Sequence, residues 1–218
     1  MSIGLEQLVW HAPPCPEEAA NNDTPPVELS AREVALIEIA ADVVTGAFVS
    51  SFDARVQIAT VPGGLTQDHI RELLRHLTPY AGLSVTAIAF ERLVENDGAL
   101  PAESEAAGES ATGAGAAEYS AWALEGFQSV DPVFAGQLHR YTEDLWERPG
   151  LSKRERALVT LATDVVSNAL GGLFSVHLAL AQRNGVSLEE VAAIIRLLGE
   201  RAPHHGIEAF EAVTAVTA

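Results

Sequence analysis

Apolar residues recur three and four positions apart over most of the sequence, which is the spacing of one face of an α-helix. The alternation of apolar and polar residues that is typical of β-strands is scarce. The clearest helical faces are Leu36, Ile37, Ala40, Val43 and Val44 early in the chain, and Leu158, Leu161, Ala162 and Val165 later. The pattern therefore predicts an all-α fold.

Both of these stretches begin with Ser-x-x-Glu, at Ser30 and again at Ser152. This is a capping box, in which the serine hydroxyl accepts the amide of the third residue and the glutamate reaches back to the serine amide. A further Ser-x-x-Glu predicts a helix that starts at Ser187, and residues 173–183 predict one that stops at Asn184-Gly185.

The two stretches also share a longer pattern, which recurs at an offset of 122 residues and drifts to 120 toward the C-terminus. Such self-similarity predicts two copies of one helical unit, and the drift predicts short insertions or deletions between matched helices. The matching pairs are Leu29–Glu33 with Leu151–Glu155, Ile39–Val44 with Leu161–Val166, Leu73–Arg75 with Ile194–Arg196, and Ala89-Phe90 with Ala209-Phe210.

Two segments without helical periodicity set the predicted boundaries. Residues 1–28 are rich in proline and indicate an extended arm, whereas residues 97–117, rich in Gly, Ala, Ser and Glu, indicate a flexible linker. The first unit is then 29–96 and the second 118–218. In the second unit, the Asp131-Pro132 pair predicts a helix start, because proline fits the first helical position.

The formal net charge of −17 disfavours nucleic acid and anionic membrane surfaces as partners. The single cysteine, Cys15, excludes an internal disulfide, a CxxC redox pair and a zinc site of several thiolates. No basic residue precedes Arg32, and the longest near-apolar stretch, 169–181, is too short to span a bilayer. These features favour a cytoplasmic protein without a membrane segment.

Four motifs carry a resemblance to a known family: Asp131-Pro132-x-Phe134, Trp146-x-x-Pro149-Gly150-Leu151-Ser152-x-Arg154-x-Arg156-x-Leu158-Val159-Thr160, His177-Leu178-x-x-Ala181-x-x-Asn184-Gly185 and, in the first half, His76-Leu77-x-x-Tyr80-Ala81-Gly82. They resemble the carboxymuconolactone decarboxylase family. The resemblance implies an all-α tandem repeat of two units of the alkylhydroperoxidase-like (AhpD-like) fold.

The chain departs from that family in several places. The peroxidase branch has Cys-x-x-Cys followed four residues later by histidine, and counting back from His177 puts Leu173 and Leu170 at the cysteine positions. Leucine supplies no thiolate, so we expect no thiol peroxidase activity. The acidic residue typical of the family is also replaced, near Ala157. Only the second half has the central histidine, whereas the first reads Ser51–Arg55 there, so the chain retains one site, two sites or none.

The resemblance implies a cofactor-free enzyme that decarboxylates, or moves a proton on, a small cyclic or unsaturated carboxylic acid or lactone. In this hypothesis His177 is the general acid, and His76 and Tyr80 are further catalytic candidates, four residues apart on one helix face. The alternative is a catalytically silent member of the family that binds a ligand or supports assembly. At residue level, the alternatives are a core histidine for His177 and a polar helix end for His76 and Tyr80.

Arg55, Arg75 and Arg196 are candidates to bind the substrate carboxylate, although salt bridging to the many acidic residues is the preferred interpretation for each arginine taken singly. Asp42 and Asp164 occupy the same repeat position on apolar helices, which favours helix capping or pairing across the repeat interface over catalysis. His204-His205 indicates a loop, and no metal site is expected because no third ligand is evident nearby.

Single-unit members of the family form rings, so the resemblance also implies a homo-oligomer. A homotrimer of fused pairs would close a six-unit ring, with a dimer as the second choice and a monomer still open. Each half would need an exposed apolar face. The residues expected to supply it in the first half are Val43, Val44, Phe48, Val49 and Phe52.

Overall fold

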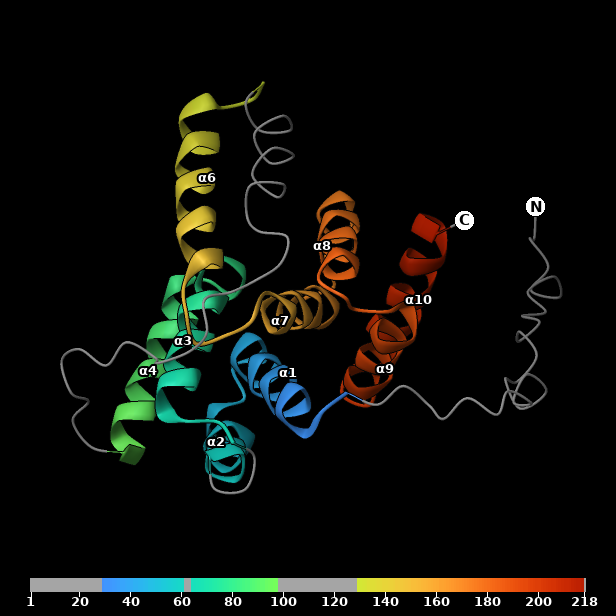
Figure 1. Cartoon of the computed structure of the whole chain (residues 1–218). Helices are drawn as coiled ribbons and strands as arrows, with labels where there is room; N and C mark the ends of the chain where they lie inside the picture. The colour runs from blue at the N-terminus through green and yellow to red at the C-terminus, as the bar shows by residue number, and fades with distance from the viewer. Residues whose placement is uncertain (1–28, 61–63, 98–128, 218) are drawn as a thin grey trace, which may run out of the picture.

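A computed structural model describes residues 29–60, 64–97 and 129–217, and these residues form helices joined by short turns (Figure 1). The all-α prediction is confirmed for this part of the chain. The predicted arm at 1–28 and nearly all of the predicted linker at 97–117 lie outside the described residues. None of the described helices is long and apolar enough to cross a membrane.

Among the described residues, four helices follow one another in the same order in both halves, and the second half has one further helix before them. The first half contains α1 (Ala31–Thr45), a π-helical turn (Phe48–Phe52), α2 (Asp53–Thr60), α3 (Gln67–Ala81) and α4 (Leu83–Asp97). The second contains α6 (Pro132–Glu147), α7 (Lys153–Val166), α8 (Gly172–Arg183), α9 (Leu188–Gly199) and α10 (Pro203–Thr217). In order and in sequence offset, α7 to α10 correspond to α1 to α4, which supports the tandem arrangement.

The helix starts form as the sequence predicts. The capping boxes are formed at Ser30, Ser152 and Ser187. The serine hydroxyl accepts a hydrogen bond from the amide three residues on, and the carboxylate of the glutamate at that position accepts one from the serine amide. Asp131 caps α6, with Pro132 in its first turn. One start was predicted wrongly, because His204 and His205 lie in the first turn of α10 and not in a loop. Proline suits that turn, so Pro203 opens the helix rather than preventing it.

Helices α1 and α7 lie side by side at the centre of the molecule, with α3 and α4 on one side and α9 and α10 on the other (Figure 1). Their N-terminal ends are joined by two reciprocal ion pairs. Arg32 Nε lies 2.5 Å from Glu155 Oε1, and Arg154 Nε lies 2.8 Å from Glu33 Oε1. Each arginine thus binds the capping glutamate of the other half. The two ion pairs therefore link the halves at matching positions, the N-terminal ends of α1 and α7.

The core has two apolar clusters, and α1 and α7 contribute to both. Ile37 of α1 packs into the cluster of the second unit, while Val159 of α7 packs into that of the first. The apolar face expected to make contacts between subunits is largely part of this core: Val43, Phe48 and Phe52 are buried, and only Val49 is strongly exposed. The prediction that these side chains form an exposed apolar face for contacts between subunits is therefore wrong.

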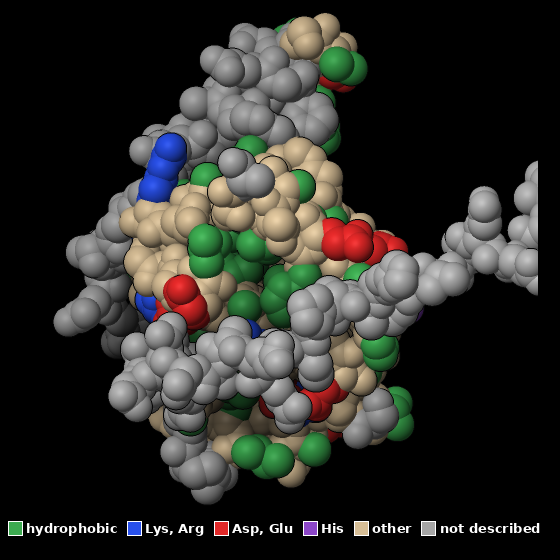
Figure 2. All heavy atoms as spheres, turned by 90° about the vertical axis from the view of Figure 1, so that its right-hand side faces the viewer, with side chains coloured by type: hydrophobic (Ala, Val, Ile, Leu, Met, Phe, Trp, Pro, Cys, Tyr) green, Lys and Arg blue, Asp and Glu red, His purple; other side chains and the backbone are tan. Residues whose placement is uncertain are grey.

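Exposed apolar side chains lie instead mainly on α4, α6 and α10. They are Leu83, Ile88 and Val94 on α4, Val133, Phe134 and Tyr141 on α6, and Ile207, Phe210 and Val216 on α10. Figure 2, which views the right-hand side of Figure 1, shows hydrophobic side chains gathered near the middle of that face, with acidic side chains around them. The outer helices are therefore less completely covered than the central pair.

Candidate functional site

Polar and aromatic side chains from both units meet where α3, α6, α7 and α8 converge. The ring centroids of His76 and Tyr80 on α3 lie 5.4 Å apart, and the ring of Tyr80 lies 5.7 Å from that of His177 on α8. Trp146 of α6 stands edge-on to His76 at 5.3 Å. The three residues proposed from the sequence as catalytic are therefore neighbours, although 97 residues separate Tyr80 from His177.

His177 forms a buried pair with Asp164. Its Nδ1 lies 2.6 Å from Asp164 Oδ2, and both residues are buried. An imidazole N–H donates to a carboxylate in such a pair, which fixes the ring orientation and makes Nε2 the other proton-carrying position. Burial raises the pKa of Asp164, and the hydrogen bond from His177 partly opposes that effect. Asp164 therefore pairs within its own unit, and the prediction that it pairs across the repeat interface is wrong.

His76 has polar neighbours at both ring nitrogens. Nε2 lies 3.0 Å from Thr160 Oγ1 and 3.2 Å from the Arg156 carbonyl oxygen, while Nδ1 lies 3.4 Å from Arg156 Nη1. The residue is fully buried. Burial, and then the charge of Arg156, hold the pKa of His76 well below its usual value of 6.5, so the ring is neutral at pH 7.

Tyr80 lies between the two histidines. Its hydroxyl oxygen accepts a hydrogen bond of 3.2 Å from Trp146 Nε1 and also bonds the Thr160 hydroxyl. Burial raises the pKa of Tyr80 to about 12, and these two hydrogen bonds only partly oppose it. Tyr80 is therefore a neutral phenol, and its ring packs at 79° to the ring of His177.

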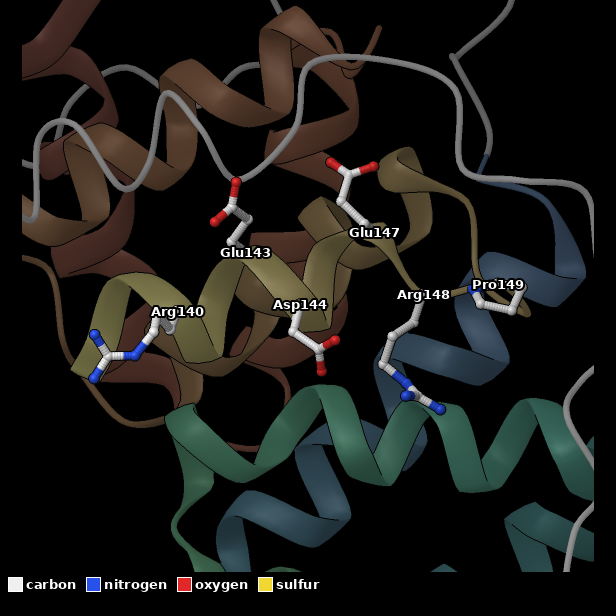
Figure 3. A pocket seen from close by; sticks show the side chains of 6 residues that line it. All are labelled: Arg140, Glu143, Asp144, Glu147, Arg148 and Pro149. Carbon is white, nitrogen blue, oxygen red and sulfur yellow. The ribbon is translucent and has the colours of Figure 1, made fainter. Parts of the chain in front are cut away.

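A buried ion pair lies behind His76. Arg156 Nη2 lies 2.9 Å from Glu72 Oε1, and the two side chains are 0% and 1% exposed. Glu72 also receives Arg148 Nε at 3.1 Å and Arg75 Nη1 at 3.2 Å, so three guanidinium groups converge on one carboxylate. Figure 3 shows Arg148 reaching from the end of α6 toward α3, which carries Glu72.

The cavity drawn in Figure 3 has a volume of about 510 Å³ and lies along α6. Its lining consists of Arg140, Glu143, Asp144, Glu147, Arg148 and Pro149. Arg148 is the residue that it shares with the Glu72 cluster, and the lining does not include His177. Among the described residues, no three His, Cys, Asp or Glu side chains are arranged to hold a metal ion.

The three arginines proposed as carboxylate ligands lie in different places. Arg55 binds Glu38 and Asp42, and Arg75 binds Glu72, as the salt-bridge alternative predicted. Arg196 is exposed near the end of α9 and makes no ion pair with a described residue. None of the three has a described contact with His177.

Sequence reasoning overlooked several members of the site, namely Glu72, Trp146, Arg156, Thr160 and Asp164. Arg156 and Thr160 stand in the motif that carries the family resemblance, so their type and spacing were visible but their partners were not. Asp164 had a stronger signal, because it lies on an apolar helix 13 residues before His177. Glu72 lies four residues before His76, on the same face of α3.

Comparison with known proteins assigns a family to the C-terminal part of the chain. Residues 132–218, from the start of α6 into the C-terminal end of the chain, match the model of the carboxymuconolactone decarboxylase family. No curated protein matches the sequence. The matched segment contains Trp146, Arg156, Thr160, Asp164 and His177, whereas His76 and Tyr80 lie outside it. Residues 132–218 are therefore similar to the carboxymuconolactone decarboxylase family, and the match does not extend to the first half of the chain.

Proposed function

We propose that the chain is a cofactor-free enzyme that decarboxylates a small cyclic or unsaturated carboxylic acid of the carboxymuconolactone type, or moves a proton on it. The observation that carries this proposal is the buried Asp164–His177 pair beside Tyr80. The family match supports the reaction class, and the pair supplies a group that can donate a proton to carbon.

In the proposed reaction, the bond between the ring carbon and the carboxylate breaks and carbon dioxide leaves. The electron pair of that bond moves into the unsaturated lactone and gives a dienolate. The Nε2–H of protonated His177 then delivers a proton to carbon, and the imidazole recovers a proton from water. Asp164 stabilises the imidazolium form through Nδ1 and keeps the ring in one orientation.

Burial serves this chemistry in two ways. The attraction between a substrate anion and a protonated His177 is stronger where water is excluded. Neutral His76 and Tyr80 add no charge that would compete with that attraction.

A screen for carbon dioxide release tests this proposal. Wild-type protein is incubated with a series of unsaturated lactone acids, in parallel with His177→Gln, which retains a polar side chain. We expect release with at least one acid by the wild type, and a rate lower by about 10²- to 10⁴-fold for the variant, which is the usual contribution of a positioned general acid. Equal rates for the two folded proteins would remove His177 from the mechanism.

We also propose that the chain is not a thiol peroxidase, because Leu170 and Leu173 stand where that chemistry needs a cysteine pair. Peroxide consumption with dithiothreitol should not exceed the buffer rate. Thiol-dependent turnover that persists in Cys15→Ser would contradict this.

A further inference from the structure

The Glu72–Arg156 pair is buried far more deeply than a structural surface ion pair would be. The two side chains are 1% and 0% exposed, and Arg156 Nη2 also donates to the Arg148 carbonyl oxygen at 2.9 Å. Burying two charges is costly, and a buried ion pair often contributes no net stability. What distinguishes this pair is that Arg156 also contacts His76, which links it to the candidate site.

The contact fixes where the proton of His76 lies. A guanidinium group can only donate hydrogen bonds, so Nδ1 of His76, 3.4 Å from Arg156 Nη1, must accept. A neutral imidazole has one N–H, which then belongs to Nε2. Nε2 faces two oxygens, those of Thr160 and of the Arg156 carbonyl, and both can accept that proton.

The proton of Thr160 is accounted for in the same way. The Thr160 hydroxyl donates its only proton to the Arg156 carbonyl oxygen at 2.9 Å. Its oxygen therefore accepts from His76 Nε2–H, 3.0 Å away, which agrees with the same tautomer.

We propose that the Glu72–Arg156 ion pair is a positioning device, which fixes buried His76 as the Nε2–H tautomer and directs that proton to Thr160 and the Arg156 carbonyl oxygen. His76 then keeps one orientation beside Tyr80, whose ring centroid lies 5.4 Å away. The tautomer does not depend on the proposed function.

Nitrogen NMR of the full-length protein labelled with ¹⁵N-histidine tests the tautomer directly, because protonated and unprotonated ring nitrogens have well-separated shifts. His76 is assigned from the signal that disappears in His76→Gln. We expect a single neutral Nε2–H tautomer at pH 7. An Nδ1–H tautomer, or a mixture of the two, in the wild type would overturn the proposal.

Arg156→Lys tests the cause. Lysine keeps a positive charge near Glu72 but lacks the fork that reaches Glu72 and His76 together. We expect His76 to lose its single-tautomer signature in this variant. Arg154→Lys is the matched control, since Arg154 lies on the same helix but binds Glu33 and Glu190.

An unchanged His76 spectrum in folded Arg156→Lys would overturn the role of Arg156. If that variant does not fold, Glu72→Gln replaces it, and the wild-type spectrum still decides the tautomer. These measurements need no substrate, so their failure is distinguishable from the absence of carbon dioxide release. A correct tautomer without turnover on any acid would count against the proposed function alone.

Discussion

Two polar centres occupy corresponding positions in the two units, and they differ in chemistry. The first centre comprises Thr160, Asp164 and His177 from the second unit with His76 and Tyr80 from the first. At the offset of 121 or 122 residues, the corresponding residues of the second centre are Glu38, Asp42 and Arg55 from the first unit with Leu197 and Arg201 from the second. Each centre therefore draws on both units.

The second centre is a ring of ion pairs. Asp42 lies 2.8 Å from both Arg55 Nε and Arg201 Nη1, and Glu38 binds the same two arginines. The arginine side chains are 28% and 27% exposed, so water screens this centre far more than the buried first one. The prediction that Asp42 pairs across the repeat interface is confirmed.

The difference shows how one arrangement of helices holds a buried histidine–aspartate pair at one centre and partly exposed ion pairs at the other. A guanidinium keeps its proton at neutral pH, so Arg55 cannot exchange a proton as an imidazole can. Two acids balance two arginines at the second centre, which leaves no net charge for a carboxylate substrate. At the first centre one acid faces one histidine, and the remaining partners are neutral.

The largest expected effect is on the free energy of unfolding, when one acidic residue is removed from the polar network of each centre. Glu72→Ala should lower the free energy of unfolding by about 3–5 kcal/mol, because it leaves the buried Arg156 without its carboxylate. Glu38→Ala should cost less than about 1 kcal/mol, because its partners are partly solvated. Urea unfolding measures both, and similar costs would contradict the contrast in burial.

The two corresponding aspartates should also differ. Asp42→Asn removes the charge that binds two arginines and should cost about 1.5–3 kcal/mol. Asp164→Asn should cost less than about 1 kcal/mol at pH 7, because an amide oxygen can still accept the hydrogen bond from His177 Nδ1–H. Chemical unfolding of the two variants side by side would refute this if Asp164→Asn were the more damaging.

The pH dependence of stability should come from the first centre. The pKa of His76 is depressed in the folded state, so below pH 6.5 the unfolded chain binds a proton that the folded chain does not. Stability is therefore fully present above pH 6.5 and falls as the pH decreases toward the depressed pKa, by at most about 1.4 kcal/mol per pH unit from this group. Stability curves of wild type and His76→Gln should converge at low pH, and parallel curves would exclude His76 as the cause.

The smallest expected effect concerns salt. Arg201→Gln should destabilise the protein by less than about 1 kcal/mol, and the loss should shrink in 1 M sodium chloride because salt screens partly exposed ion pairs. Thermal unfolding at low and high salt provides the measurement. A loss that is independent of salt would mean that Arg201 acts through packing.

Much of the fold could be predicted from the sequence, because its signals are local. The capping boxes at Ser30, Ser152 and Ser187 and the Asp131-Pro132 start all form as expected. The prediction of a loop at His204-His205 was wrong because two polar residues after a proline occur both in loops and in the first turn of a helix, and here they lie in the first turn of α10. The buried positions of Val43, Phe48 and Phe52 depend on how the units pack together, which apolar spacing alone does not determine.

The site was predicted less completely than the fold. His76, Tyr80 and His177 were found because each belongs to a recognisable motif, although no sequence feature indicated that they meet. Glu72 was missed, and Asp164 was assigned another role. The role of a buried carboxylate depends on the residues that it contacts across the core, and the sequence does not show those contacts. Aspartates that occupy one repeat position, Asp42 and Asp164, have different partners for the same reason.

We propose that decarboxylation occurs at the first centre and not at the second, and a matched pair of variants separates the two. His177→Gln and Arg55→Gln change corresponding residues, and carbon dioxide release is measured for both on the acid that the wild type turns over. We expect loss of release in folded His177→Gln and release close to the wild-type rate in folded Arg55→Gln. Retained release in the first variant, or lost release in the second, would contradict this proposal.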